Sequence, residues 1–331
     1  MQITPLDLGD ADDLAELAAL QNAVADVDSP WERPSTTASV RGMYVHGWDG
    51  EPSTPYLARD GGKVVGCGSI GTSEYDNRDI AFFRVAIHPA HRRHGVGSAI
   101  LAALTDEARR RGRTNLVADA WDTPAGGAFA AHHGFVAKLA SINRRQVLVD
   151  IDWEALDEKY AAALPHASDY RIERWPVPTP DDRLDALAEM AAAINDAPLD
   201  DLDYEDEVFT GARMRAYEEA MAGRDERMYR LVARHVPTDT LAAQTVVVVW
   251  TEDPTWGEQH DTSVTRAHRG HRLGLVLKTE MLRWLREAEP QLALVDTWNA
   301  ESNDHMIGVN EILGYRVMGR EWAYQRPLAT E

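Results

Sequence analysis

Residues 90–97 read Ala-His-Arg-Arg-His-Gly-Val-Gly, and residues 267–274 read Ala-His-Arg-Gly-His-Arg-Leu-Gly, so the two copies lie 177 residues apart. The same spacing relates Asp119-Ala120-Trp121 to Asp296-Thr297-Trp298. A repeat of about domain length indicates one fold used twice. We therefore expect two domains, over residues 1–160 and 161–331, which agrees with the length of the chain.

The composition narrows the class of protein. The chain has a formal net charge of -20, which disfavours a nucleic-acid partner because phosphate backbones require a basic surface. Cys67 is the single cysteine, so no internal disulfide can form, and a reducing cytoplasm is the expected location. The first ten residues do not resemble a signal peptide, and the apolar stretch 246–250 is too short to cross a membrane.

The hydrophobic pattern predicts the same order of elements in both halves. In the first half we expect helices at about 10–24, 39–45, 96–108 and 126–133, and strands near residue 3 and at 56–59, 63–72, 80–88, 116–121 and 145–151. A helix at 153–163 leads to the second half. There, helices are expected at 183–194, 211–221, through Leu277 to Leu285 and at 306–313, with strands at 170–175, 228–234, 241–250, 259–266 and 292–298 before closing strands. Thr179 is expected to cap the helix that follows it. The fold class is therefore α+β.

Each repeated segment joins a strand to a helix through a turn that contains glycine. Such a turn exposes backbone N–H groups at the positive end of the helix dipole, which is a suitable site for a diphosphate. Glycine lets the backbone approach phosphate oxygens closely. The alternative is a tight connection with solvated arginines, but two such turns in register favour an anion site.

The first turn resembles the acetyl-coenzyme A signature of the GNAT superfamily of N-acetyltransferases: Arg or Gln, two residues, Gly, any residue, then Gly or Ala. The resemblance covers nearly the whole chain, as a tandem two-domain form with a layout similar to that of mycothiol synthase. It implies two domains, each with a mixed, largely antiparallel sheet flanked by helices. It also implies that acetyl-CoA is the co-substrate and that no metal is needed.

The resemblance further implies which residues hold the coenzyme. The strand edge would pair with pantetheine, the turn amides would hold the diphosphate, and the thioester would lie between this strand and strand 116–121. The implied contacts in the first half are Val85, Ala86, Ile87, Arg92, Arg93, His94, Gly95, Val96, Gly97 and Ser98. In the second half they are Val264, Arg269, His271, Arg272, Leu273, Gly274 and Asn303.

The second turn departs from the signature because Arg272 replaces the inner glycine. Its side chain is expected to crowd the phosphates, or alternatively to contact a phosphate through its guanidinium. Asn303 has an equally good interpretation as a helix cap.

Catalysis requires a base for the amine and a proton for the leaving thiolate. Many family members supply that proton from a tyrosine, where this chain has Ala130 and Asn310, so the thiolate would leave into solvent. On the strand entering the second turn, a period of two puts Glu258, His260, Thr262 and Val264 on one face. Glu258 and His260 are therefore the predicted catalytic residues, which favours the second half.

Several other residues have competing interpretations. Tyr75, Glu74 and Asp76 are alternatives for the base in the first half. Cys67 is expected to be a small core residue rather than an acyl carrier. In the acidic run 200–207, Asp203, Glu205 or Asp206 could receive an ammonium group, although a solvated loop is the simpler interpretation.

The predicted function is transfer of an acetyl group from acetyl-CoA to the amine of a small cationic acceptor, such as an amino sugar, an antibiotic or a polyamine. The alternatives are a thiol-pathway acetyltransferase and a non-catalytic coenzyme-binding or scaffold protein. The protein is expected to be a monomer or a homodimer.

Overall fold

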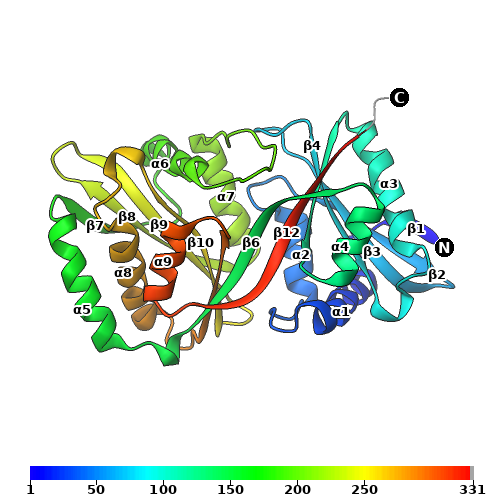
Figure 1. Ribbon diagram of the computed structural model, residues 1–331, viewed down its shortest axis with the longest axis horizontal. Coiled ribbons are helices and arrows are strands. Elements are labelled where there is room, and N and C mark those ends of the chain that lie inside the picture. Colours follow the sequence, from blue (N-terminus) through cyan, green and yellow to red (C-terminus); the bar gives the residue numbers. More distant parts are fainter. Residues whose placement is uncertain (329–331) are drawn as a thin grey trace. The chain divides into compact units, whose positions relative to one another are not determined.

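A computed structural model describes residues 1–328, and the chain divides into two compact units. The first unit comprises Met1–Ser141, Leu199–Asp206 and the segment from Gly319 onward. The second unit comprises Ile142–Pro198 and Glu207–Met318. Both units contain a mixed sheet with helices, so the predicted α+β class is confirmed (Figure 1).

In the first unit, the sheet order is β1-β2-β3-β4-β5-β12. Only β4 and β5 pair in parallel. The elements are β1 (Gln2–Pro5), α1 (Ala11–Asp28), α2 (Thr37–His46), β2 (Thr54–Asp60), β3 (Lys63–Gly71), β4 (Ile80–Ile87), α3 (Val96–Arg110), β5 (Asn115–Trp121), α4 (Pro124–His132) and the part of β12 (Arg316–Pro327) from Gly319.

In the second unit, the sheet order is β6-β11-β10-β9-β8-β7, and β10 and β11 are parallel. The elements are the end of β6 (Val136–Val147), α5 (Trp153–Ala163), β7 (Tyr170–Trp175), α6 (Leu184–Ala191), α7 (Gly211–Gly223), β8 (Glu226–His235), β9 (Thr240–Trp250), β10 (Trp256–Val264), α8 (Leu273–Ala288), β11 (Leu294–Ala300) and α9 (Asp304–Ile312).

The closing strands differ from the sequence prediction. The strand expected at 145–151 begins instead at Val136, and its residues from Ile142 belong to the second unit. The last strand of the chain, β12, pairs antiparallel with β5 in the first unit, where Trp322 and Tyr324 join the core. Each unit is therefore completed by a strand from the other half of the sequence.

Two hydrophobic layers cover the sheet of the first unit. On one face, Ile100 and Leu104 of α3 pack against Leu116 of β5. On the other face, Leu17 of α1 and Tyr44 of α2 pack against the sheet. Side chains of β4 and β5 therefore alternate between an α3 face and an α1–α2 face, and this alternation decides which residues can meet a substrate.

Strand β10 contains an irregularity that the sequence pattern did not reveal. Gln259 pairs with Val247 and Thr262 pairs with Thr245, so one extra residue lies on β10 in a β-bulge. The Gln259 amide donates to the Thr245 hydroxyl, and that hydroxyl also bonds the Thr262 hydroxyl. The prediction that Glu258, His260, Thr262 and Val264 share a face is therefore wrong, because the period of two is broken at the bulge.

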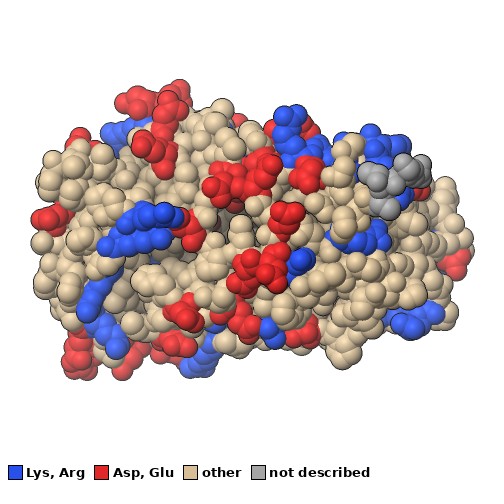
Figure 2. Space-filling model, turned by 45° about the horizontal axis from the view of Figure 1, so that its top comes forward, with Lys and Arg blue, Asp and Glu red and all other residues tan. Residues whose placement is uncertain are grey.

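The face of the molecule shown in Figure 2 carries both acidic and basic side chains among residues of other kinds, while the formal net charge of the chain is -20. Within residues 1–328, no helix has the length and apolar character that a membrane span requires.

Candidate functional site

The first unit has an opening between its two parallel strands. The pairing of β4 with β5 ends at Phe83 and Ala118, although the strands continue to Ile87 and Trp121. On its other edge β4 stays paired with β3, where Val85, Ala86 and Ile87 lie opposite Gly68, Cys67 and Gly66. The edge facing the opening can therefore accept an extended ligand.

The second unit has the same feature. The pairing of β10 with β11 ends at Gln259 and Thr297, whereas the strands run on to Val264 and Ala300. Both openings lie beside the turn that leads into a long helix.

In the first turn, two residues adopt the left-handed conformation, Arg93 with φ 66° and Gly95 with φ 80°. Gly95 occupies the N-cap position of α3, so no side chain at this position accepts a hydrogen bond from the first amides of the helix. A Cβ atom built on Gly95 would meet nothing within 4 Å. The amides at the start of α3 thus begin beside open space, which fits a bound diphosphate.

The second turn keeps this backbone with a different sequence. Its left-handed residues are Gly270, with φ 84°, and Arg272, with φ 57°, so the glycine has changed places with an arginine. The Arg272 guanidinium donates to the Ala162 carbonyl at 3.4 Å, and the His271 ring contacts the His166 carbonyl at 3.0 Å. The Arg272 side chain is directed to the end of α5 and not toward the start of α8. The alternative that its guanidinium contacts a phosphate is therefore not supported by this geometry.

The first arginine of each turn has a structural role. Arg92 donates from Nε to the Ile87 carbonyl and forms an ion pair with Asp28 at 2.6 Å. Arg269 repeats both contacts with Val264 and Asp196, again with a 2.6 Å ion pair. Both side chains therefore hold the strand end to the acid that ends the first helical segment of the half, rather than extending toward an anion.

The remaining residues of the first turn support the packing of α3 on α4. Ser98 Oγ lies 3.0 Å from His133 Nε2. A Cβ on Gly97 would lie 2.9 Å from the Phe129 ring, so only glycine allows this contact. His94 and Val96 line an open pocket with Val65 and Asp60. Glycine is thus required at 95 for conformation and at 97 for close packing.

Three charged side chains that the sequence analysis did not single out lie at the start of the first opening. Arg84 on β4 and Asp119 on β5 directly follow the last paired residues, and both are exposed although their strands lie inside the sheet. They alternate with the core residues of the α3 face, so they lie on the α1–α2 face. Glu321 on β12 lies two residues from Ala323, the partner of Asp119. Three neighbouring strands thus place one cation and two carboxyl groups on one face.

The surroundings alter the acidity of these carboxyl groups. Burial among protein atoms raises the pKa of Glu321 to about 7, and the charges of Asp119 and Glu32 act in the same direction, whereas Arg84 opposes them. Although the Asp119 side chain is exposed to the opening, desolvation by the surrounding protein atoms raises its pKa, and Arg84 lowers it. A carboxyl group with a pKa near neutrality can take up a proton at physiological pH.

Aromatic residues form a wall beside these charges. The Trp31 and Trp121 rings meet edge to face at 5.1 Å, and Trp121 Nε1 donates to Glu32 at 3.3 Å. A Cβ on Gly319 would lie 2.2 Å from the Trp31 ring. The glycine at the start of the exchanged part of β12 is therefore necessary for this wall.

The corresponding opening in the second unit has its charges paired. Arg145 on β6 forms a two-point ion pair with Asp296, with N–O distances of 2.7 and 2.8 Å, and covers the Trp256 ring at 4.2 Å. The Tyr217 hydroxyl lies 2.5 Å from His260 Nδ1. Burial and the cationic Arg224 and Arg230 lower the pKa of His260 to about 3, so its imidazole is neutral and a weak base at pH 7.

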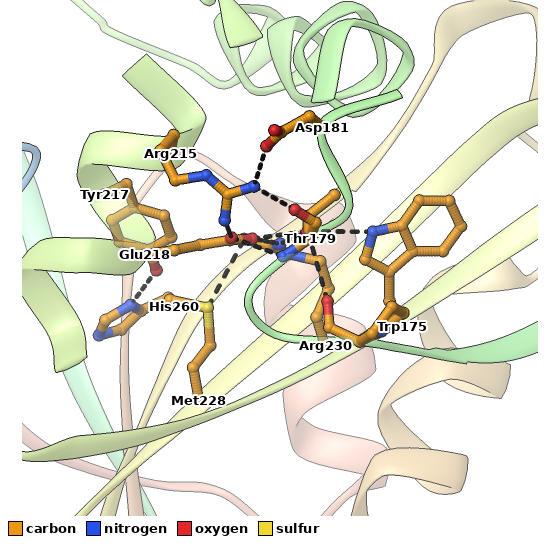
Figure 3. A network of polar contacts seen from close by, with 10 residues as sticks. Trp175, Thr179, Asp181, Arg215, Tyr217, Glu218, Met228, Arg230 and His260 are labelled. Carbon is orange, nitrogen blue, oxygen red and sulfur yellow. Dashed lines mark hydrogen bonds and ion pairs between the residues drawn. The ribbon is translucent and has the colours of Figure 1, made fainter. Parts of the chain in front are cut away.

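A buried polar network lies next to His260 (Figure 3). Glu218 is 3% exposed and accepts hydrogen bonds from the Thr179 amide and hydroxyl and from Arg215 and Arg230. Trp175 donates to the Thr179 hydroxyl at 3.1 Å. Thr179 is therefore a network member and not the predicted helix cap; the cap position of that short turn is Pro180.

A second buried chain of polar groups reaches the opening of the second unit from α8. Lys278, which is 2% exposed, donates to Asn310 Oδ1 at 2.6 Å, and Asn310 Nδ2 donates to Asn299 Oδ1 at 2.6 Å. Asn299 lies on β11 beyond its last residue paired with β10. Burial lowers the pKa of Lys278 to about 7. Asn310 is thus held between two side chains at the position where a tyrosine was sought.

The other sequence candidates have structural partners. Glu74 forms ion pairs with Arg78 and Arg113 on the surface, and Asp76 accepts from Asn77. Asn303 caps α9 by accepting from the Met306 amide. Burial raises the pKa of the Cys67 thiol to about 12, which agrees with a core residue.

Residues 200–206 of the acidic run belong to the first unit, although in the sequence they lie between α6 and α7. Leu202 and Tyr204 pack into its core, and the Asp203 and Glu205 amides donate to Gln325 and Asn77. Leu202 and Tyr204 therefore anchor the run in the first unit, and the binding of an ammonium group by Asp203, Glu205 or Asp206 stays a prediction.

One signal in the sequence could have indicated the charged trio. An arginine in the middle of strand 80–87 and an aspartate in the middle of strand 115–121 are unusual, because interior strands seldom bury charges. Glu321 gives no local signal, since its neighbourhood depends on the pairing of β12 with β5.

These features define a class of protein. Residues 18–135 match the acetyltransferase (GNAT) family model. These residues form a GNAT acetyltransferase domain, and with the repeated turn and the parallel opening in both units the chain has a tandem GNAT-like fold. It is an acyltransferase of a family that uses acetyl-CoA.

Particular relatives support this assignment over the whole chain. A mycothiol acetyltransferase from Parafrankia sp. (strain EAN1pec) is 26% identical over 95% of this chain and 96% of its own. A solved tandem GNAT protein from the clavulanic acid biosynthesis pathway is 27% identical, with a TM-score of 0.81 over 100% of this chain and 99% of its own. A GCN5-related N-acetyltransferase from Sphaerobacter thermophilus shares the fold at 14% identity, with a TM-score of 0.69, covering 99% and 96%.

Proposed function

We propose that the protein transfers the acetyl group of acetyl-CoA to the amine of a small, cationic acceptor, and that the reaction takes place in the first unit. The observation that supports this most strongly is the pair of carboxyl groups, Asp119 and Glu321, at the start of the opening between β4 and β5. An acidic site accessible to solvent attracts an ammonium group and can then accept its proton.

The first turn is the proposed site for the diphosphate of the coenzyme. The amides from His94 to Ser98 would supply donors at the N-terminus of α3, and the free edge of Val85–Ile87 would pair with the pantetheine arm. Arg92 and Gly97 support this site by fixing the turn and the α3–α4 contact.

Glu321 is the proposed general base. With a pKa of about 7, it takes a proton from the ammonium group, directly or through water, and leaves a neutral amine. The amine nitrogen then bonds to the thioester carbonyl carbon while the carbon–sulfur bond breaks, and the nitrogen releases its second proton to solvent. Because Ala130 offers no acid, the thiolate takes its proton from solvent.

The second unit keeps the fold and the turn, but its proposed role is different. Its Asp296 is paired with Arg145, and the His260 imidazole is bonded to Tyr217. Catalysis by Glu258 and His260 stays a prediction, and it is the direct competitor of the proposal for the first unit.

The experiment is coenzyme A release from acetyl-CoA with a panel of small amines, combined with calorimetry of coenzyme binding. We expect release that depends on the amine, with one amide product formed for each thiol. Tight coenzyme binding without turnover of any amine would contradict the proposal and would favour a scaffold protein.

A thiol-pathway acetyltransferase is the second candidate function. It is supported by the 26% identity with the Parafrankia mycothiol acetyltransferase over 95% of this chain. Turnover of that enzyme's acceptor in preference to the amines of the panel would select this alternative. The cytoplasmic location and the monomeric or dimeric state stay predictions.

A further inference from the structure

Arg84, Asp119 and Glu321 are close enough to influence one another's charge but do not neutralise one another by direct contact. Arg84 affects the pKa of both carboxyl groups. Nevertheless, within residues 1–328 no hydrogen bond or ion pair joins the Arg84 guanidinium to either carboxylate. The three groups therefore present donors and acceptors of opposite charge to the same open space.

In the second unit, an arginine and an aspartate on neighbouring strands neutralise each other by direct contact. There, Arg145 and Asp296 form a two-point ion pair on neighbouring strands, and both side chains are about nine-tenths buried. Such a pair neutralises both charges and uses two donors of the guanidinium and both oxygens of the carboxylate. In the first unit the arginine and the acids stay apart and Arg84 is exposed, so their hydrogen-bonding capacity is available to a ligand.

The chemistry of that ligand follows from the charges. A guanidinium exposed in a concave site binds a carboxylate through two parallel hydrogen bonds. Asp119 and Glu321, on the next two strands, suit an ammonium group. Adjacent strands lie about 4.8 Å apart, so Asp119 is one strand and Glu321 two strands from Arg84, a span that a small molecule with two charged groups can bridge.

We propose that the acceptor carries a carboxylate as well as the amine that is acetylated, so that it is an amino acid or a small amino-acid derivative. Arg84 binds the carboxylate, and Asp119 and Glu321 receive the amine. This inference rests on the proposed function, since it names the acceptor class of the same site. Arg84 is a specificity-determining residue in this account, and Glu321 keeps its role as the base.

The test compares amino acids with their carboxamides, which keep the amine but lose the negative charge. Glycine, β-alanine and L-lysine are each paired with glycinamide, β-alaninamide and L-lysinamide, and coenzyme A release is measured with the full chain. We expect kcat/KM to be about 10- to 100-fold higher for the acid of the best pair, the effect of one charged hydrogen-bonded contact. Equal kcat/KM within every pair would overturn the inference and leave the proposed function intact.

Arg84→Gln supplies the second arm. We expect the acid-to-amide ratio of kcat/KM to fall to near one, with the loss mainly in KM for the acid, and Arg84→Lys to restore part of the ratio. The matched control is Arg110→Gln, which removes an exposed arginine from the last turn of α3 and is expected to keep the ratio. A ratio unchanged in Arg84→Gln would contradict the inference. No release from any acid or amide would count against the proposed function itself.

Discussion

Each of the two units contains a sheet that opens between two parallel strands. The openings differ in whether their charged side chains are paired with one another. In the first, Arg84, Asp119 and Glu321 come from three neighbouring strands and remain accessible. In the second, Arg145 holds Asp296, Tyr217 holds His260 and Lys278 holds Asn310. Paired and buried charges stabilise one arrangement, whereas unpaired charges at an opening are costly unless a ligand uses them. The two units thus keep the same strand arrangement but differ in how their charged side chains are paired.

The largest expected effect comes from removing the proposed base. Glu321→Gln should lower kcat/KM by about 10²- to 10⁴-fold, the usual range for loss of a general base. In the parent protein kcat/KM should rise with pH and level off above about 7, because Glu321 is active only when deprotonated and its pKa is about 7. The variant should lose this pH-dependent rise.

Glu258→Gln is the matched variant in the second unit. Both changes keep the shape of the side chain and remove one negative charge, and rates are measured by coenzyme A release. A larger loss of kcat/KM in Glu258→Gln than in Glu321→Gln would contradict the assignment of catalysis to the first unit.

The next effect concerns coenzyme binding. Gly95→Glu forces a side chain into the left-handed position at φ 80° and adds negative charge beside the diphosphate. We expect affinity at the first turn to fall at least about 30-fold, as two unfavourable contributions of one to two kcal/mol combine. Calorimetry reads this directly, and an unchanged stoichiometry would refute the assignment of the site.

Lys278 provides a smaller effect that belongs to the second unit. Its native pKa is about 7, below the ordinary lysine value, so the native state loses the proton near neutrality while the unfolded chain keeps it. The stability of the parent protein should therefore rise, relative to that of Lys278→Met, by about 2 kcal/mol between about pH 7 and about pH 9. Thermal unfolding at several pH values measures the difference. Parallel pH curves for the two proteins would show that the lysine is not held in this environment.

The smallest effect tests the exchanged glycines of the two turns. Arg272→Gly relieves a left-handed conformation at φ 57°, but glycine also gains entropy in the unfolded chain, so we expect stabilisation of no more than about 1 kcal/mol. Gly95→Ala should instead destabilise by about 1 kcal/mol. Denaturant unfolding of both variants checks the signs, and destabilisation by Arg272→Gly would mean that its contact with Ala162 outweighs the strain.

Local patterns predicted most of the frame, because strands, helices and turns depend on nearby residues. The repeated turn, the helix after it and the parallel strands beside it lie where the sequence indicated. The exchange of β6 and β12 could not be predicted, since partner choice depends on residues more than a hundred positions away. Glu321 was therefore missed.

Catalysis by Glu258 and His260 stays a prediction, but the prediction of one shared strand face from Glu258 to Val264 is wrong for a different reason. It relied on strict alternation along β10, and the bulge between Gln259 and Thr262 interrupts that alternation. Burial then lowered the pKa of His260, which sequence position alone cannot reveal.

The central claim is that acetyl transfer takes place in the first unit. A crystal structure of the full chain with coenzyme A and an N-acetylated product tests it directly. We predict density for the diphosphate against the first turn of α3, with the product amide between Arg84 and Glu321. Density for coenzyme and product only between β10 and β11, with the β4–β5 opening empty, would contradict the account.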